Sequence, residues 1–534
     1  MPDINEVSRR RRRVQAPTPL VVVCLFIGLL VLSPLVYLVV RALQGSGTER
    51  LGSFLFSMQT LGYAGRSIGL ACVVVVGSLT LSMILAWVTL ARDLPFRRVC
   101  TMLVVCPLAV PCYVGAAVFI GVFSSRGPLG AFCADLGLAP GWFSGFWASA
   151  FVLTLFVYPL AFLSIRAGLR GIDRAAFDAA RVLGCSTMGS FRSGILPQLR
   201  PSIVGGAVVV ALYSLSEFGA VSMLRTNTFT RVIYIQYESA FDRTGAAFSS
   251  LALAFLIGCV LVLSGRFRRS HAVARRAHGY RPLEWHLGAW RWAALFLVLG
   301  VVSLGLVLPV WSLISWWGRT SLSVDLTALF TGPLVNSLLL SFAAAVSVIL
   351  LAMPIGLLCS RHASPLATLI ERMTHVGFGL PGIVVGLSLV FLALKLIPGL
   401  YQTWFVVVLG YCVLFLALAT GPIRTGFERA SRSFDDAART LGAGRWLRFR
   451  TVTLPFLLPG VISGFLLVFI STAKELPCTL LLSPAGNHTL ATRVWQYTDE
   501  AMYAEAAIPA LALILISAVF VGVLVWREDL LESA

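Results

Sequence analysis

Twelve apolar stretches, most of them about 20 residues long, divide this sequence of 534 residues. A helix needs about 20 apolar residues to cross the ~30 Å hydrocarbon core of a bilayer. Only 12% of the residues are charged, whereas soluble proteins carry about 25%. The sequence therefore predicts an all-α integral membrane protein with about 12 transmembrane helices, at residues 19–41, 67–90, 100–123, 144–165, 202–223, 246–264, 292–316, 335–359, 374–394, 403–422, 457–474 and 507–526.

The distribution of basic residues predicts how these helices are oriented. If the N-terminus is cytoplasmic, 31 of the 42 Lys and Arg residues fall in cytoplasmic segments, including five arginines at 9–13. Loops on the cytoplasmic side are enriched in Lys and Arg, so the net charge of +19 needs no nucleic acid partner. We expect a multi-pass protein of a bacterial inner membrane, in contact with membrane lipid and with both termini in the cytoplasm.

A polar segment occurs twice in this apolar chain, at residues 178–201 and 436–459. The two copies align without a gap and are identical at 12 of 24 positions. The shared residues include Asp178, Ala179, Ala180, Gly184, Leu196 and Pro197 in the first copy, and Asp436, Ala437, Ala438, Gly442, Leu454 and Pro455 in the second. Both copies lie on the predicted cytoplasmic side.

The duplication divides the chain into two six-helix halves that begin on the same side of the membrane, and so form a parallel repeat. We predict a first repeat at 1–265 with its polar loop at 166–200, a basic cytoplasmic linker at 266–291, and a second repeat at 292–534 with its polar loop at 423–458.

Each polar segment has the pattern of a helix, a turn and a second helix. A carboxylate and two alanines favour the start of a helix at Asp178. Gly184 allows the left-handed turn that ends a helix, and Leu196-Pro197 marks the return to the membrane. A basic helix held on the surface by anionic lipid is the alternative, but lipid binding requires charge rather than this duplicated spacing.

The duplicated segment resembles the signature of ABC-importer permeases, Glu-Ala-Ala, three residues, Gly, nine residues, Ile, one residue, Leu-Pro. Both copies match at Ala-Ala, Gly and Leu-Pro. They differ by Asp178 and Asp436 in place of Glu, and by Gly194 and Val452 at the Ile position. The resemblance covers the whole chain as two fused permease domains and implies the type I ABC importer permease fold. It also implies that both segments are coupling helices that dock on an ABC ATPase dimer in the cytoplasm.

A separate subunit would have to supply the ATP site. A Walker A loop requires GxxxxGK[ST], and neither of the two lysines, Lys395 and Lys474, lies in one. We expect no enzyme activity and no cofactor in this chain, with ATP and Mg²⁺ on the partner ATPase.

Two glutamates after the coupling segments are candidates for the substrate pathway. Glu217 and Glu475 are related by the same offset of 258 residues as the coupling segments. Each lies about 16 residues beyond Pro201 or Pro459, which is ~24 Å along a helix. Ionisable groups at such depth are costly and usually functional. The alternative is that both helices end one turn earlier and the glutamates meet interfacial water.

The sequences around these glutamates, SEFGAVSMLR and KELPCTLLL, resemble the ferric-iron permeases of the family. This resemblance implies ferric iron as cargo, delivered by a periplasmic ferric-binding protein to outer loops that include 225–245 and 483–505. Fe(III) is a hard cation that prefers oxygen ligands, which Glu217, Glu475, Tyr234 and Tyr237 could supply. No resident metal site is assigned.

Three other functions remain open at this point. An importer of the same class could carry thiamine, phosphonate or polyamine. A proton- or ion-coupled secondary transporter can also have two parallel six-helix repeats, but it has no need of a long duplicated loop after each fourth helix. A membrane scaffold would leave the duplication unexplained.

Overall fold

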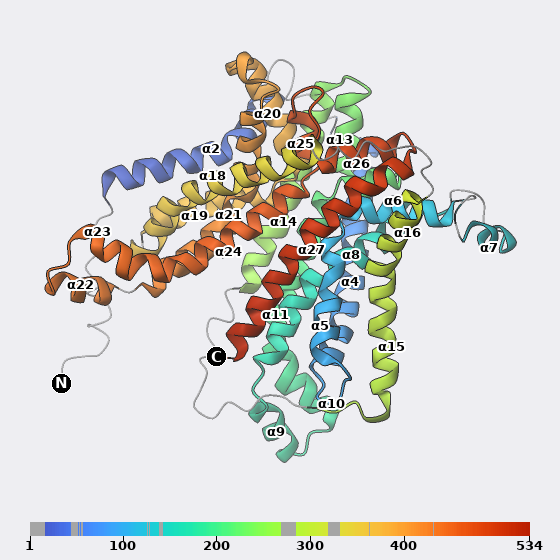
Figure 1. The fold of residues 1–534 in the computed structure, drawn as a ribbon, viewed down its shortest axis with the longest axis horizontal. Coiled ribbons are helices and arrows are strands. Elements are labelled where there is room, and N and C mark those ends of the chain that lie inside the picture. The colour runs from blue at the N-terminus through green and yellow to red at the C-terminus, as the bar shows by residue number, and fades with distance from the viewer. Residues whose placement is uncertain are drawn as a thin grey trace. The chain divides into compact units, whose positions relative to one another are not determined.

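A computed structural model of the protein describes residues 17–43, 52, 54, 57–124, 127, 129–137, 142–268, 285–318, 332–362, 364–430 and 432–533 (Figure 1). Helices make up nearly all of these ranges, and no strand occurs in them. The all-α fold class is confirmed.

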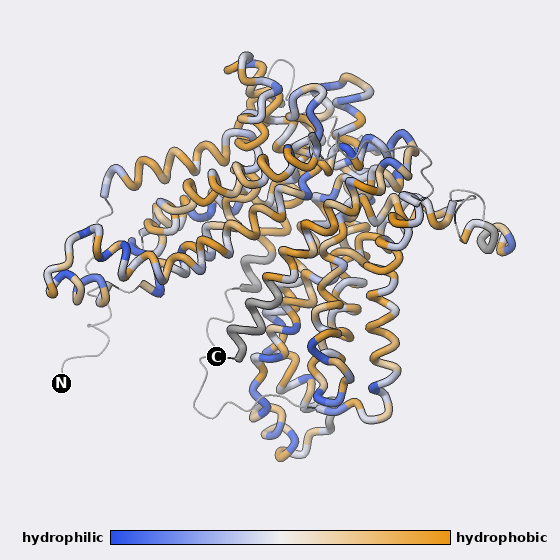
Figure 2. Tube along the Cα trace, viewed as in Figure 1, coloured by the Kyte–Doolittle hydropathy of each residue, from blue (hydrophilic) through white to orange (hydrophobic). Residues whose placement is uncertain are grey.

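Ten helices are long and apolar enough to cross a membrane within the part of the chain that the structure describes. They are α2 (Thr18–Leu43), α4 (Met58–Leu90), α8 (Gly145–Arg170), α11 (Leu196–Ser216), α14 (Arg243–Arg268), α15 (Arg291–Val302) continued through a π turn by α16 (Leu308–Trp317) and counted as one, α18 (Pro333–Arg361), α21 (Trp404–Arg429), α24 (Leu454–Ala473) and α27 (Tyr503–Ser533). Figure 2 shows them as mainly hydrophobic rods with hydrophilic residues gathered toward their ends.

The third and ninth predicted helices are bent, which corrects the expectation of single helices at 100–123 and 374–394. The first bent pair is α5 (Arg97–Val105), which continues into η1 (Cys106–Ala109), and α6 (Cys112–Phe123), at 89°. The second is α19 (Pro365–Gly379) and α20 (Gly382–Leu396), at 103°. The number of spans is twelve if each pair counts as one.

A proline lies at each break. Pro111 and Pro381 precede α6 and α20, and both have extended backbone (ψ 141° and 143°). Proline has no N–H to donate to a preceding turn, and the extended backbone of these two prolines takes the chain out of the first helix. Both halves therefore break at the same place in the repeat.

Two compact units make up the fold. One contains α2 together with α18 to α25 (Pro477–Leu482), and the other contains α4 to α16 together with α26 (Leu490–Asp499) and α27. Helix α2 thus packs with helices of the second repeat: a methyl group on Gly28 of α2 would lie 3.1 Å from Met373 of α19.

In the other unit, helices of the second repeat pack with the first. Pro107 of η1 lies against Gly305, in the π turn between α15 and α16. The rings of Trp316 in α16 and Tyr503 in α27 are 5.2 Å apart. The compact units therefore differ in membership from the predicted sequence repeats, whose boundaries at 265 and 292 stay a prediction.

Among the ten long apolar helices, the two most buried occupy corresponding positions in the two halves. For α8 the most apolar stretch is 72% buried, and for α21 it is 61%. These are the fourth and tenth spans, and each leads directly into a polar loop. A rigid, well-packed helix thus supports each duplicated segment.

Candidate functional site

The first polar segment forms α9 (Ala175–Val182). The helix begins earlier than predicted, because the Asp173 carboxylate accepts the Ala175 N–H (3.0 Å). Asp178 lies within the first turn and pairs with Arg174 at 3.2 Å. Since both side chains are almost half exposed, this ion pair contributes little to stability.

The end of α9 is fixed by Gly184. Its φ of +86° lies in the left-handed region that glycine adopts without steric cost. The Cys185 N–H donates to the Ala180 carbonyl and the Gly184 N–H to the Arg181 carbonyl, both at 3.0 Å. This pair of bonds is the Schellman motif, and it satisfies carbonyls that the helix end would otherwise leave unpaired.

The second polar segment repeats this geometry in α22 (Arg432–Thr440). Gly442 has φ +82°, and the Ala443 N–H donates to the Ala438 carbonyl at 3.0 Å. Asp436 is not in the first turn; Asp435 is, and it pairs with Arg448 at 2.8 Å. The left-handed turn predicted at both glycines is confirmed.

Each segment returns to the membrane through a π-helical turn. In the first copy, α10 (Thr187–Ser190) continues through Phe191–Ile195 into α11. In the second, α23 (Arg445–Arg448) continues through Phe449–Thr453 into α24. Pro197 and Pro455 stand directly after these π turns, as the second residues of α11 and α24. The predicted second short helix is thus continuous with a membrane helix.

Glu217 directly follows α11 and caps a short helix, α12 (Gly219–Met223). Its Oε1 accepts the Ala220 N–H at 3.1 Å, and its backbone carbonyl accepts the Thr230 hydroxyl at 2.7 Å. A carboxylate at the start of a helix satisfies a free N–H and complements the helix dipole.

The carboxylate of Glu475 makes the equivalent contact in the other half, whereas its carbonyl contacts a residue of its own short helix. Its Oε1 accepts the Cys478 N–H at 3.0 Å, and its carbonyl accepts the Thr479 hydroxyl at 2.8 Å, at the start of α25. The carboxylate lies against Gly382, the first residue of α20, where a side chain would collide with Oε1. It therefore sits at the break of a bent span.

Both membrane helices end before their glutamate, α11 at Ser216 and α24 at Ala473. This corrects the expectation that the carboxylates lie on the helices themselves. The alternative, that the two glutamates lie in bulk water, does not apply either. Each glutamate is partly buried, and its carboxylate accepts a hydrogen bond from a backbone N–H.

The two predicted tyrosines lie in α13 (Phe229–Glu238). The Tyr234 ring packs on Phe218 (5.0 Å between centroids) and on Trp495 (6.4 Å). Burial raises the pKa of Tyr234 to about 12, so its hydroxyl is protonated at neutral pH. Among the described residues, no group of three or more His, Cys, Asp or Glu side chains could hold a metal ion.

The sequence also matches a known family in both halves. The profile of the binding-protein-dependent transport system inner membrane component matches residues 78–269 and 352–534. Each match contains one polar segment, one bent-span break and one glutamate-capped helix. The chain belongs to this family. It is a multi-pass inner membrane permease with two fused copies of the permease domain.

Among its relatives is the Fe(3+)-transport system permease protein FbpB 2 of Haemophilus influenzae, which is 30% identical over 94% of this permease and 97% of the relative. The probable ABC transporter permease protein y4fN of Sinorhizobium fredii is 25% identical over 78% and 79%. The molybdenum transport system permease protein ModB of Escherichia coli is 34% identical over 28% of this permease and 73% of the relative.

The polar segments of the permease expose large apolar side chains. Val182 and Leu183 are 87% and 83% exposed at the end of α9, and Leu441 and Trp446 are 86% and 74% exposed in the second copy. These residues lie beside the left-handed glycines Gly184 and Gly442, within or directly after the Schellman turns.

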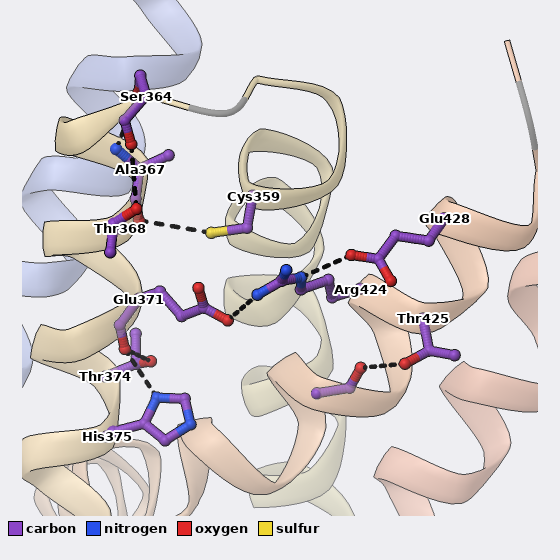
Figure 3. A network of polar contacts seen from close by, with 11 residues as sticks. Cys359, Ser364, Ala367, Thr368, Glu371, Thr374, His375, Arg424, Thr425 and Glu428 are labelled. Carbon is purple, nitrogen blue, oxygen red and sulfur yellow. Dashed lines mark hydrogen bonds and ion pairs between the residues drawn. The ribbon is translucent and has the colours of Figure 1, made fainter. Parts of the chain in front are cut away.

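An ionic network that the sequence reading missed braces the second half of the permease (Figure 3). Arg424 of α21 pairs with Glu371 of α19 and with Glu428 (2.8 Å) of its own helix. The Arg361 guanidinium donates to the Ala430 carbonyl at 2.7 Å, which ties α18 to the same end of α21. The Arg424–Glu428 spacing of four residues is a recognisable helix pair, but only the fold brings Glu371 to it.

Proposed function

We propose that this permease is the membrane subunit of an ATP-binding-cassette importer that moves ferric iron into the cytoplasm. The observation that carries the proposal is the 30% identity to a Fe(3+)-transport permease over 94% of the chain. The match extends over nearly the full length of both proteins, so the similarity is not confined to a single coupling motif.

The polar segments support a cytoplasmic ATPase dimer as the partner. Exposed apolar groups in a polar surface mark protein interaction sites. Each of the two polar segments presents such groups beside its own Schellman turn. A dimeric ATPase with two equivalent grooves would meet two equivalent segments. The Lys and Arg distribution supports placing both segments and both termini in the cytoplasm.

ATP and Mg²⁺ would bind to that partner, since the permease sequence contains no Walker A pattern. Closure of the ATPase dimer on ATP would move the two coupling segments. Each π turn joins its segment directly to α11 or α24, so movement would pass along these helices to the glutamate-capped turns at their far ends.

The carboxylates favour a cationic cargo. Glu217 and Glu475 follow the two membrane helices that continue from the coupling segments. Their carboxylate oxygens are hard ligands of the kind that Fe(III) prefers. The relatives named for 2-aminoethylphosphonate and molybdenum transport match about a third of the chain or less, so they support those cargoes less than the nearly full-length match supports iron. A periplasmic ferric-binding protein would deliver the iron to the outer loops. We infer that substrate contacts involve the glutamates more than Tyr234, whose ring packs against Phe218 and Trp495.

Uptake of radiolabelled ferric iron into cells tests the proposal. The comparison is between a deletion strain, the strain complemented with this permease, and the same strain with molybdate or a phosphonate as competitor at excess. We expect uptake to depend on the gene and to be unaffected by the anions. Unchanged iron uptake in the deletion strain, with no second iron importer active, would reject iron as the cargo.

A further inference from the structure

The last residues of the central linker attach to the turn between α4 and α5. The N–H groups of Leu287 and Gly288 donate to the two oxygens of the Asp93 carboxylate at 2.8 and 2.7 Å. The Arg92 N–H donates to the Trp285 carbonyl at 3.1 Å. Three backbone groups therefore hold residues 285–288 in one place on the first repeat.

This attachment presents an aromatic ring to α4. Trp285 stacks on Trp87, with the ring centroids 4.2 Å apart and the planes at 19°. Trp87 in turn meets Phe191 edge-on at 6.2 Å and 73°. Phe191 is the first residue of the π turn that joins α10 to α11. A row of three rings thus connects the linker end to the first polar segment.

The second polar segment is stabilised differently. Phe449, which corresponds to Phe191, packs on Trp446 of its own segment at 5.9 Å. The Asp435–Arg448 ion pair closes the same segment on itself. The first copy has Met188 in place of Trp446, Phe177 in place of Asp435 and Ser190 in place of Arg448. It lacks the residues for either internal contact.

The position of Trp87 is also specific to the first half. The residue at the corresponding place in the second repeat is Leu357, which offers no ring for stacking. The linker itself occurs once in the chain. Both members of the external contact, Trp87 and Trp285, are therefore present only where the internal contacts are missing.

We propose that Trp285, held by Asp93, acts with Trp87 as a brace that positions the first coupling segment. The linker end would then be a functional part of the energy-coupling apparatus. This inference rests on the proposed function, since the braced segment is taken to be the ATPase contact. Trp285 is a positioning residue: it acts through Phe191 and has no contact with cargo or nucleotide.

Hydrogen–deuterium exchange on the purified full-length permease tests the brace independently of transport. In Trp285→Ala we expect exchange at 187–196 to rise about tenfold, a loss of protection equivalent to about 1.4 kcal/mol, and exchange at 445–454 to stay as in the wild type. Trp285→Phe, which keeps a ring, should restore protection. Asp93→Ala removes the attachment without touching a ring and should raise exchange at the same residues.

Two further variants serve as matched controls. Trp290→Ala alters a 75% exposed tryptophan of the same region and should leave 187–196 unchanged. Trp446→Ala should raise exchange at 445–454 only. Equal exchange at 187–196 in wild type and Trp285→Ala would overturn the proposal, as would an equal rise in Trp290→Ala.

Transport supplies the second readout. With the ATPase and binding protein reconstituted, Trp285→Ala should lower the maximal rate of ATP-driven uptake severalfold and leave the half-saturating concentration of binding protein unchanged, and Trp285→Phe should recover the rate. A wild-type rate in Trp285→Ala overturns the coupling role. Absence of ATP-driven iron uptake in the wild type would instead reject the proposed function, and the exchange result would still decide whether the brace exists.

Discussion

Single residues carry the turn on which each coupling segment depends. Gly184 and Gly442 share the left-handed backbone, and a Cβ at either position would meet open space. Substitution there tests the backbone alone, because no neighbouring atom would be displaced.

We expect Gly442→Ala to destabilise its segment by roughly 1–2 kcal/mol, the cost of a left-handed L-residue, and to reduce ATP-driven uptake. Gly442→Asn should be milder, since Asn tolerates this region. The matched control is Gly444→Ala, in the same segment and also in open space but with an ordinary φ of −65°. Equal uptake in Gly442→Ala and Gly444→Ala would contradict the prediction.

At Glu217 and Glu475, substitution separates the helix-capping role from the charge. Gln keeps an oxygen that can accept the Ala220 or Cys478 N–H, whereas Ala loses the cap at a cost of about 1 kcal/mol. If charge serves the cargo, both Gln variants should keep the wild-type unfolding temperature and lose iron uptake. Iron uptake and thermal unfolding are measured on the same variants. Normal iron uptake in the double Gln variant would show that the charges of the two glutamates do not serve the cargo.

The seat of Glu475 allows a separate test, because Gly382 lies directly against its carboxylate. Gly382→Ala should push the side chain off its cap, with an overpacking cost of about 1–3 kcal/mol, and reduce uptake. Gly421→Ala, where a Cβ meets open space, is the control and should transport normally. A crystal or cryo-EM structure of Gly382→Ala in which the Glu475 side chain has not moved would contradict this prediction.

At the scale of elements, the attachment of the linker end to the α4–α5 turn depends on the charge of Asp93. The pKa of its carboxyl is held below the ordinary value, chiefly by the Leu287 N–H and further by the Gly288 N–H and His286. A carboxylate with a depressed folded-state pKa stabilises the fold above its unfolded value of about 3.9. That stability is lost as the pH falls through the folded-state pKa.

Asp93→Asn should therefore lower the unfolding temperature at pH 6. The difference from wild type should shrink as the pH falls below about 4, where the unfolded chain takes up the proton, and should vanish once the pH is below the depressed folded-state pKa, where the Asp93 carboxyl is also uncharged. Thermal unfolding of the detergent-solubilised permease between pH 3 and 6 measures this. A difference that is constant over the whole range would mean that the charge of Asp93 does not hold the linker.

The whole molecule joins helices that are distant in the sequence. The compact unit that contains most of the second repeat includes α2, and the unit that contains most of the first repeat includes α15, α16, α26 and α27. Neither half of the sequence, expressed alone, contains a complete unit.

Cutting the chain between residues 275 and 276 should thus give two fragments that need each other. We expect each fragment alone to be degraded or aggregated, because apolar surface that α2 or α16 normally covers is left without its protein partner. Coexpressed fragments should co-purify through a tag on one of them. An uncut chain with a protease site at this position is the control, and a monodisperse, cooperatively unfolding fragment 1–275 would contradict the prediction.

The sequence by itself determined the membrane class, the repeat and the coupling turns. Length and hydropathy suffice for spans, because hydrocarbon forces each crossing segment to satisfy its backbone internally. The left-handed backbone conformation at the end of a helix is also determined by nearby sequence, so Gly184 and Gly442 could be identified as the turn residues. The helix start predicted at Asp178 was misplaced because Asp173 takes the capping role, and in the second copy the first turn contains Asp435 rather than Asp436.

Tertiary structure alone decided the rest. The breaks at Pro111 and Pro381 turn through about a right angle, whereas a proline in a pattern predicts only a kink of unknown size. Hydropathy also cannot predict contacts between residues that are distant in the sequence. Examples are the surroundings of Glu217 and Glu475, the ion pair of Arg424 with Glu371, and the stacking of Trp285 on Trp87. Such contacts depend on which helices are neighbours in the fold. Hydropathy does not predict these neighbours, because the apolar helices have similar length and composition. Close packing of small residues and hydrogen bonds between a few polar groups determine which membrane helices associate.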